Sequence, residues 1–75
     1  MSAGPYIVIL TRSTSSALKA EKALVNAGIE CKLIPVPRHL SSDCGVCIRI
    51  RREDQDAALR ALELAQVDVA GVHAL

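Results

Sequence analysis

The feature that most constrains the fold is the order in which hydrophobic periodicity changes along the chain. Tyr6–Leu10 is a continuous, largely β-branched apolar run, which predicts a central strand covered on both faces. From about Ser15 to Ala27 the apolar residues recur at helical spacing instead, and Gly28 is placed to end that helix. The Ser/Thr residues at positions 11–16 offer several N-caps for the helix. Its predicted core stripe is Ala17, Ala20, Leu24 and Ala27.

The second half repeats the same change of period. Residues 29–34 alternate, and the prolines at positions 35 and 37 place this strand at a sheet edge, where a missing N–H costs little. Residues 46–51 alternate as a third strand, and Asp54 is a candidate cap for a second helix. Residues 67–75 predict a last strand, weakened by Gly71. The stripe predicted for the second helix is Ala58, Ala61, Leu62 and Ala65, with Ala57 and Leu64 beside it.

The resulting order of strand, helix, strand, strand, helix, strand predicts a single α+β domain over residues 1–75. Two split βαβ units of this length indicate a ferredoxin-like βαββαβ sandwich, with a four-stranded antiparallel sheet in the order 4-1-3-2 and both helices on one face. The other face of the sheet is then expected to be bare. Because the first strand is apolar on both sides, that bare face is expected to be partly apolar and to pair two subunits as a homodimer.

Composition limits the classes of function. The net charge is +1 with acids and bases mixed, which gives no electrostatic case for nucleic acid or for an anionic membrane. Tyr6 is the only aromatic residue, so the stacking platforms of small RNA-binding sheets are lacking. The apolar run at the N-terminus is too short for a signal-peptide core or a membrane span, and we expect a cytoplasmic protein. A core of this size leaves no room for a deep pocket, so a site should lie at the surface or between subunits.

The connection between the second and third strands is the candidate functional segment. It runs from Val36 to Gly45, longer than a tight hairpin needs, and long ordered loops in small domains are usually functional. Cys44 lies near its end, and Gly45 after it leaves room for close approach. Topology brings the N-terminus of the first helix to this end of the sheet. That helix end, together with nearby cations, would favour a thiolate at Cys44. These cations are Arg12, Arg38 and His39, whereas Asp43 opposes the effect.

Cys44 and Cys47 have the CxxC spacing, yet the pattern is weak. One such pair is half a zinc site at best, and side chains three apart on an extended segment point to opposite faces. A metal bridging two subunits through Cys44 and Cys47 stays open as an alternative, while Cys31 and Cys47 otherwise read as ordinary strand residues. No cofactor is indicated. An anion-binding or proton-transfer surface around the Cys44 thiol could be formed by Arg38, His39, Ser41 and Ser42. The alternative is a solvated polar loop, which is the preferred interpretation for His39 alone.

The segments YIVILT, ALKAEKAL and LIPVPRHLSSDCGVCIRI resemble the small selenium/sulfur carrier-like proteins of bacteria. The resemblance covers almost the whole chain and is most specific in the stretches PVPR and SSDCG, at positions 35–38 and 41–45. It places the family's carrier cysteine on Cys44, its proline-arginine signature on Pro37 and Arg38, and its helix glutamate on Glu21. It assigns no role to His39 or Cys47.

Residues and resemblance together lead to a carrier hypothesis rather than a stand-alone enzyme. Cys44 would accept sulfur or selenium as a persulfide or selenopersulfide from a donor protein and pass it to an acceptor protein. Arg38, Ser41, Ser42 and Gly45 would shape the site and hold the anionic cargo. The alternative is a ferredoxin-like binding or regulatory module that uses the loop or the bare sheet face, with Cys44 only structural.

Overall fold

The computed structural model describes residues 4–40 and 45–75 of the chain. Within these ranges the chain forms four strands, two α-helices and one short 3₁₀ helix. In chain order they are β1 (Tyr6–Thr11), α1 (Thr14–Asn26), β2 (Cys31–Pro35), β3 (Val46–Arg51), η1 (Arg52–Asp54), α2 (Gln55–Leu64) and β4 (Val69–Ala74). Neither α-helix has the length and apolar character that crossing a bilayer would require, within this described part of the chain.

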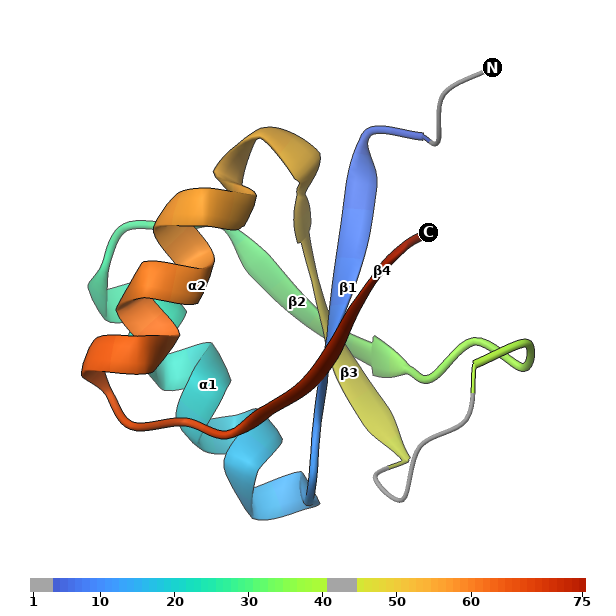
Figure 1. The fold of residues 1–75 in the computed structure, drawn as a ribbon, viewed down its shortest axis with the longest axis horizontal. Coiled ribbons are helices and arrows are strands. Elements are labelled where there is room, and N and C mark those ends of the chain that lie inside the picture. The colour runs from blue at the N-terminus through green and yellow to red at the C-terminus, as the bar shows by residue number, and fades with distance from the viewer. Residues whose placement is uncertain (1–3, 41–44) are drawn as a thin grey trace.

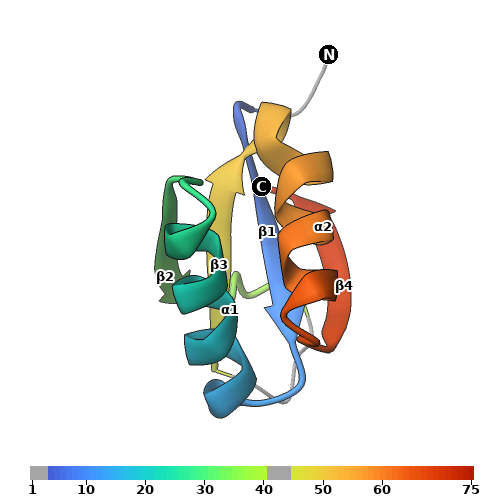
Figure 2. The ribbon, with the colours of Figure 1, turned by 90° about the vertical axis from the view of Figure 1, so that its left-hand side faces the viewer.

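The sheet has the predicted topology. Its four strands lie in the order β2-β3-β1-β4, which is 4-1-3-2 read in reverse, and every pairing is antiparallel. Both helices cover one face of the sheet, as Figures 1 and 2 show. β1 is therefore central and β2 lies at an edge, as its prolines predict.

The main core lies between the helices and the sheet. Ile7, Ile9, Ile48 and Ile50 point to the helices from the two central strands and are at most 3% exposed. The facing helix positions are small, since Ala20 and Ala58 are fully buried. Small residues let the helices approach the sheet closely, so a chain without Phe or Trp still fills this layer. The helix stripes are thus confirmed at Ala17, Ala20, Leu24, Ala58 and Leu62.

Some details of the helix faces differ from the prediction. Ala27 caps α1 and is exposed instead of buried, because the chain has already left the helix there. Leu64 is 81% exposed, whereas Leu59, which the predicted stripe omitted, packs against the core. The strands begin slightly later than predicted, since β2 starts at Cys31 and β4 at Val69. The first predicted strand residues, Ile29 and Val67, instead donate the backbone hydrogen bonds that close the turns after the two helices.

Both ends of α1 are defined by specific hydrogen bonds. Ser13 is the N-cap, and its hydroxyl accepts a hydrogen bond of 3.1 Å from the Ser16 N–H. At the other end Gly28 has a φ of 78°, and its N–H donates to the Val25 carbonyl. The Ile29 N–H donates to the Leu24 carbonyl at 2.9 Å, which completes a Schellman motif.

α2 also ends in a Schellman motif, but its left-handed position is held by a residue with a Cβ instead of a glycine. Gln66 has a φ of 60° and donates to the Glu63 carbonyl, while the Val67 N–H donates to the Leu62 carbonyl. Gln66 therefore occupies the left-handed position that Gly28 occupies after α1. At the start of α2 the predicted cap is wrong in detail. Asp54 stands at the N-cap, but its side chain makes no capping hydrogen bond because η1 runs directly into the helix.

The two Schellman motifs predict that Gly28→Ala and Gln66→Gly change the stability of the protein in opposite directions. Gly28→Ala should destabilise the protein by about 1–2 kcal/mol, because a Cβ disfavours the left-handed conformation. Gln66→Gly should stabilise the protein by up to about 1 kcal/mol, because glycine adopts the left-handed conformation without strain. The gain is limited because glycine also increases the conformational entropy of the unfolded chain. Urea unfolding of both variants and of wild type measures the two free-energy changes. Changes of the same sign would contradict this account.

Candidate functional site

The loop between β2 and β3 is closed at its base by the backbone. The Val36 N–H donates to the Gly45 carbonyl at 3.2 Å. A turn follows, in which the Leu40 N–H donates to the Pro37 carbonyl at 3.0 Å. Arg38 and the histidine after it occupy the two exposed corners of this turn. The proline-arginine pair singled out in the sequence therefore forms a compact, solvent-facing turn.

Apolar residues of this loop pack on the sheet face opposite the helices. Val8, Leu10 and Cys47 are at most 4% exposed and form a second cluster there. Ile34, Val36 and Leu40 pack against it. Figure 1 shows residues 36–40 of the loop on the side of the sheet away from both helices. We call these six residues the loop-covered cluster.

This cover corrects the expectation of a bare apolar face. The apolar residues that the face contributes from β1 and β3 are buried within one chain, because the loop folds back over them. The homodimer remains a prediction, but the exposed apolar surface on which it was based is not present at Val8 or Leu10.

Several predicted site residues lie outside the described part of the chain. These residues are Ser41, Ser42, Asp43 and Cys44. Gly45 is described, and it is exposed. Among the described residues, a Cβ built on Gly45 would meet no atom within 4 Å, and its φ lies outside the left-handed region. The described part of the chain therefore gives no steric reason for a glycine at this position.

The start of α1 lies at the same end of the sheet as the loop base. Ile9 pairs with Ile48 near the C-terminal end of β1 and the beginning of β3, as topology predicted. Thr11 is buried and donates a hydrogen bond of 3.1 Å to the Ser13 carbonyl, which fixes the entry into the helix. Arg12 forms an exposed ion pair with Asp68 at 3.5 Å, and its expected proximity to Cys44 stays a prediction because Cys44 lies outside the described residues.

Glu21 lies next to a cysteine other than the predicted carrier. The Cys31 thiol donates to the backbone carbonyl of Glu21 at 3.9 Å. Burial raises the pKa of the Cys31 thiol, and the Glu21 carboxylate raises that pKa further. Cys31 is therefore protonated and weakly nucleophilic at neutral pH, since the thiolate is the reactive form.

Cys47 is equally unsuited to surface chemistry. Its side chain is fully buried in the loop-covered cluster, and its thiol donates to the Pro35 carbonyl at 3.9 Å. Neither Cys31 nor Cys47 is in a disulfide. Across residues 4–40 and 45–75 no three His, Cys, Asp or Glu side chains come together as a metal site. The alternative metal pair of Cys44 and Cys47 involves a residue outside those ranges and stays a prediction.

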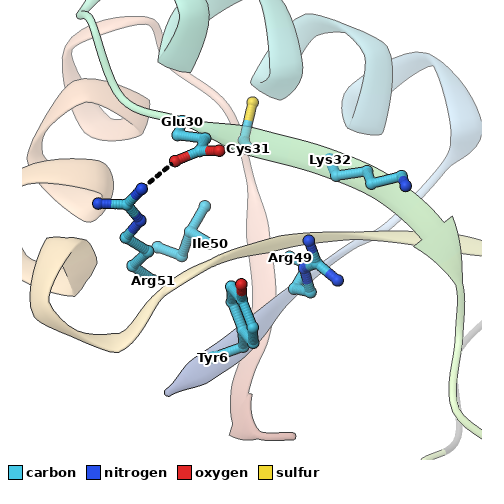
Figure 3. A pocket seen from close by; sticks show the side chains of 7 residues that line it. All are labelled: Tyr6, Glu30, Cys31, Lys32, Arg49, Ile50 and Arg51. Atoms are coloured by element: carbon cyan, nitrogen blue, oxygen red, sulfur yellow. Dashed lines mark hydrogen bonds and ion pairs between the residues drawn. The ribbon is translucent and has the colours of Figure 1, made fainter.

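Sequence reasoning missed a polar cluster on the open sheet face. A pocket of about 140 Å³ lies there, and Figure 3 shows the residues that line it. The Arg49 guanidinium stands 4.2 Å from the centre of the Tyr6 ring, and Arg51 pairs with Glu30. The alternation of residues 46–51 already predicts that Arg49 and Arg51 project from one face of the sheet. The sequence does not reveal the strand register, which places Lys32 beside Arg49.

The fold and the loop can now be compared with known proteins. A model of the family described as "Putative Se/S carrier protein-like" matches residues 6–74. The chain belongs to this family. The match begins with the first residue of β1 and ends with the last residue of β4, so the family is defined over the whole fold. No curated protein and no solved structure matches the chain.

The environment of Cys31 in this Se/S carrier-like protein predicts slow alkylation at neutral pH. Iodoacetamide should label Cys31 more slowly in the folded protein than in the denatured protein, and the rate should increase as alkaline pH forms the thiolate. Glu21→Gln removes only the smaller cause of the raised pKa, so it should accelerate labelling only slightly. Peptide mass spectrometry at neutral and alkaline pH measures these rates. Equal labelling of Cys31 in folded and denatured protein at neutral pH would contradict the assignment.

The loop cover over Cys47 predicts a local effect of loop mutation. Leu40→Ser should weaken the loop-covered cluster and increase the alkylation rate of Cys47, while Cys31 on the helix side keeps its rate. Leu18→Ser is the matched control, because Leu18 is 53% exposed and belongs to α1, which covers the other face of the sheet. The same time course of alkylation reports both thiols. Acceleration at both would indicate global unfolding and would contradict a local cover.

Proposed function

We propose that the protein carries sulfur or selenium on Cys44, which accepts the atom from a donor protein and passes it to an acceptor protein. Family membership over residues 6–74 is the observation that carries this proposal. The resemblance in the SSDCG stretch assigns the carrier role to Cys44.

The surroundings of the other two thiols support this assignment. A carrier thiol must reach a partner and must ionise near neutral pH. Cys47 is fully buried, so a partner cannot reach it in the folded chain. Cys31 has a raised pKa, so it is a poor nucleophile at neutral pH. Cys44 is the one remaining cysteine of the sequence.

The transfer needs no external oxidant or reductant. The Cys44 thiolate attacks the outer sulfur of a donor persulfide, and the S–S bond of the donor breaks. The donor leaves as a thiolate, and the outer sulfur with its proton becomes bonded to Cys44. A donor selenopersulfide reacts in the same way at selenium. The acceptor then removes the atom by attacking it, which releases Cys44 as a thiolate.

The remaining parts of the proposed site come from the loop and from α1. Arg38 would attract the anionic persulfide, and Ser41 and Ser42 would donate hydrogen bonds to it. The N-terminus of α1 adds a positive dipole at the same end of the sheet. We further propose that the domain is a ferredoxin-like sandwich that works in the reducing cytoplasm of a bacterium, where a persulfide is reversibly formed and removed.

Loading of Cys44 by a cysteine desulfurase tests the carrier proposal. Incubation with the desulfurase and ³⁵S-labelled cysteine should load wild-type protein with label that dithiothreitol releases. Cys44→Ser should abolish loading, because a hydroxyl cannot form a persulfide. Mass spectrometry of the intact protein should show one added sulfur.

Two further variants serve as controls for loading. Cys31→Ser should load like wild type, because Cys31 is not the carrier. Gly45→Ala should fold normally, since a Cβ there meets no atom of residues 4–40 and 45–75, so reduced loading would indicate that partners need close approach at Gly45. Equal labelling of wild type and Cys44→Ser would refute the carrier proposal.

A further inference from the structure

Charge is unevenly distributed between the sheet and the rest of the chain. The four strands contain three permanent cations, Lys32, Arg49 and Arg51, and one histidine, His73. None of the strands contains an Asp or Glu, although the chain has eight of these acids. Arg51 is paired with Glu30, which directly precedes β2, so Lys32 and Arg49 are the strand cations outside that ion pair in a protein whose net charge is only +1.

Strand register brings these basic residues to one face and one row. Val8 pairs with Arg49 on one side and with His73 on the other. Arg49 pairs in turn with Lys32 at the sheet edge. Paired residues in a sheet project from the same face, and Val8 belongs to the loop-covered cluster, so all four lie on the face opposite the helices. We call His73, Val8, Arg49 and Lys32 the basic row.

The contact at the sheet-edge end of this row is electrostatically unfavourable within the chain. Lys32 and Arg49 are direct cross-strand partners, and like charges in that position repel each other. The Tyr6 ring packs against the Arg49 guanidinium and holds it in place without neutralising it. The one carboxylate among the residues that line the pocket is Glu30, and it pairs with Arg51. Figure 3 shows Lys32 and Arg49 beside each other and apart from that ion pair.

The width of the row favours an extended ligand over a compact anion. Neighbouring strands lie about 4.8 Å apart, so a row across four strands is about 14 Å wide. An extended peptide rises about 3.3 Å per residue and could follow the row with about four residues. A single phosphate or sulfate ion would meet only the Lys32 and Arg49 end of it.

Nucleic acid fits this face less well than an acidic peptide. The chain has one aromatic ring, that of Tyr6, and the Arg49 guanidinium already covers it. A sheet that binds single-stranded nucleic acid relies on free aromatic faces for stacking. Carboxylates, in contrast, match the bidentate donors of Arg49 and the ammonium of Lys32 directly.

We propose that the basic row is a docking surface for an acidic segment of a partner protein. The segment lies across the open face, with its carboxylates on Lys32 and Arg49 and its main chain toward His73. The row borders the loop-covered cluster, since Val8 belongs to both. A partner docked there is held beside the loop that leads to Cys44. Binding itself does not depend on whether Cys44 carries a chalcogen.

Fluorescence anisotropy with a labelled hexaglutamate peptide tests the docking surface. Wild type should bind the peptide saturably at low ionic strength and more weakly as salt is added. Lys32→Glu combined with Arg49→Glu should weaken binding by at least about tenfold, because the attraction becomes repulsion. Lys19→Glu combined with Lys22→Glu changes the net charge equally on exposed positions of α1 and should retain most of the binding. The single variant Lys32→Gln, at an exposed edge position, should weaken binding measurably if the double variant does not fold.

Other results would overturn the proposal. Equal weakening by both double variants would mean that only net charge matters. Tighter binding of a single-stranded oligonucleotide of the same charge would assign the row to nucleic acid, and displacement of the peptide by equimolar phosphate would assign it to a compact anion. Self-association that Lys32→Glu/Arg49→Glu abolishes would assign it to a second copy of the chain. Loading of Cys44 by a small-molecule persulfide is measured in parallel, and it should be the same in all variants, so failure of docking is distinguishable from failure of the carrier chemistry.

Discussion

The burial of β1 on both faces is the constraint on which the rest of the structure depends. Val8 and Ile9 follow each other in the strand, point to opposite faces, and are both fully buried. The helices cover Ile9, but both helices lie on that one side. The opposite side therefore needs a second cover, and Val36 and Leu40 of the β2–β3 connection pack against the cluster that contains Val8.

The same packing ties the candidate site to the core. The loop is fixed at its base by the bond between Val36 and Gly45 and on the sheet by Leu40. Cys44 immediately precedes Gly45 in the sequence, so the proposed carrier residue adjoins the hydrogen-bonded base of the loop.

Features that depend on local geometry could be predicted from the sequence. Alternation assigned the side chains of β3 to the correct faces, because the period of a strand is fixed. Pro35 placed β2 at an edge, and Gly28 ended α1, since each residue restricts or frees one backbone angle. The family, whose model matches residues 6–74, could also be identified from the sequence, because the motif residues around Cys44 are contiguous.

Features that depend on which distant segments meet could not be predicted. The position of Glu21 beside Cys31 follows from how α1 lies on β2, and the pairing of Lys32 with Arg49 follows from strand register. Gln66 was missed for a different reason. Its left-handed conformation is disfavoured for a residue with a Cβ, so the tertiary position of Val67 in the core imposes it. The roles proposed for the loop residues around Cys44 remain predictions.

The division of the open face into a covered apolar part and an uncovered basic part fits a protein that must release its partners. An exposed apolar face would favour a permanent interface, because burial of apolar area gives slow dissociation. Here Leu10 and Cys47 are already covered within the chain, so in the proposed docking a partner would meet Lys32 and Arg49 instead. Charges of this kind accelerate encounter and select partners more than they prolong contact. A carrier of the proposed kind, which visits a donor and then an acceptor, needs fast, short-lived contacts with both, and the proposed docking at the basic row would provide them.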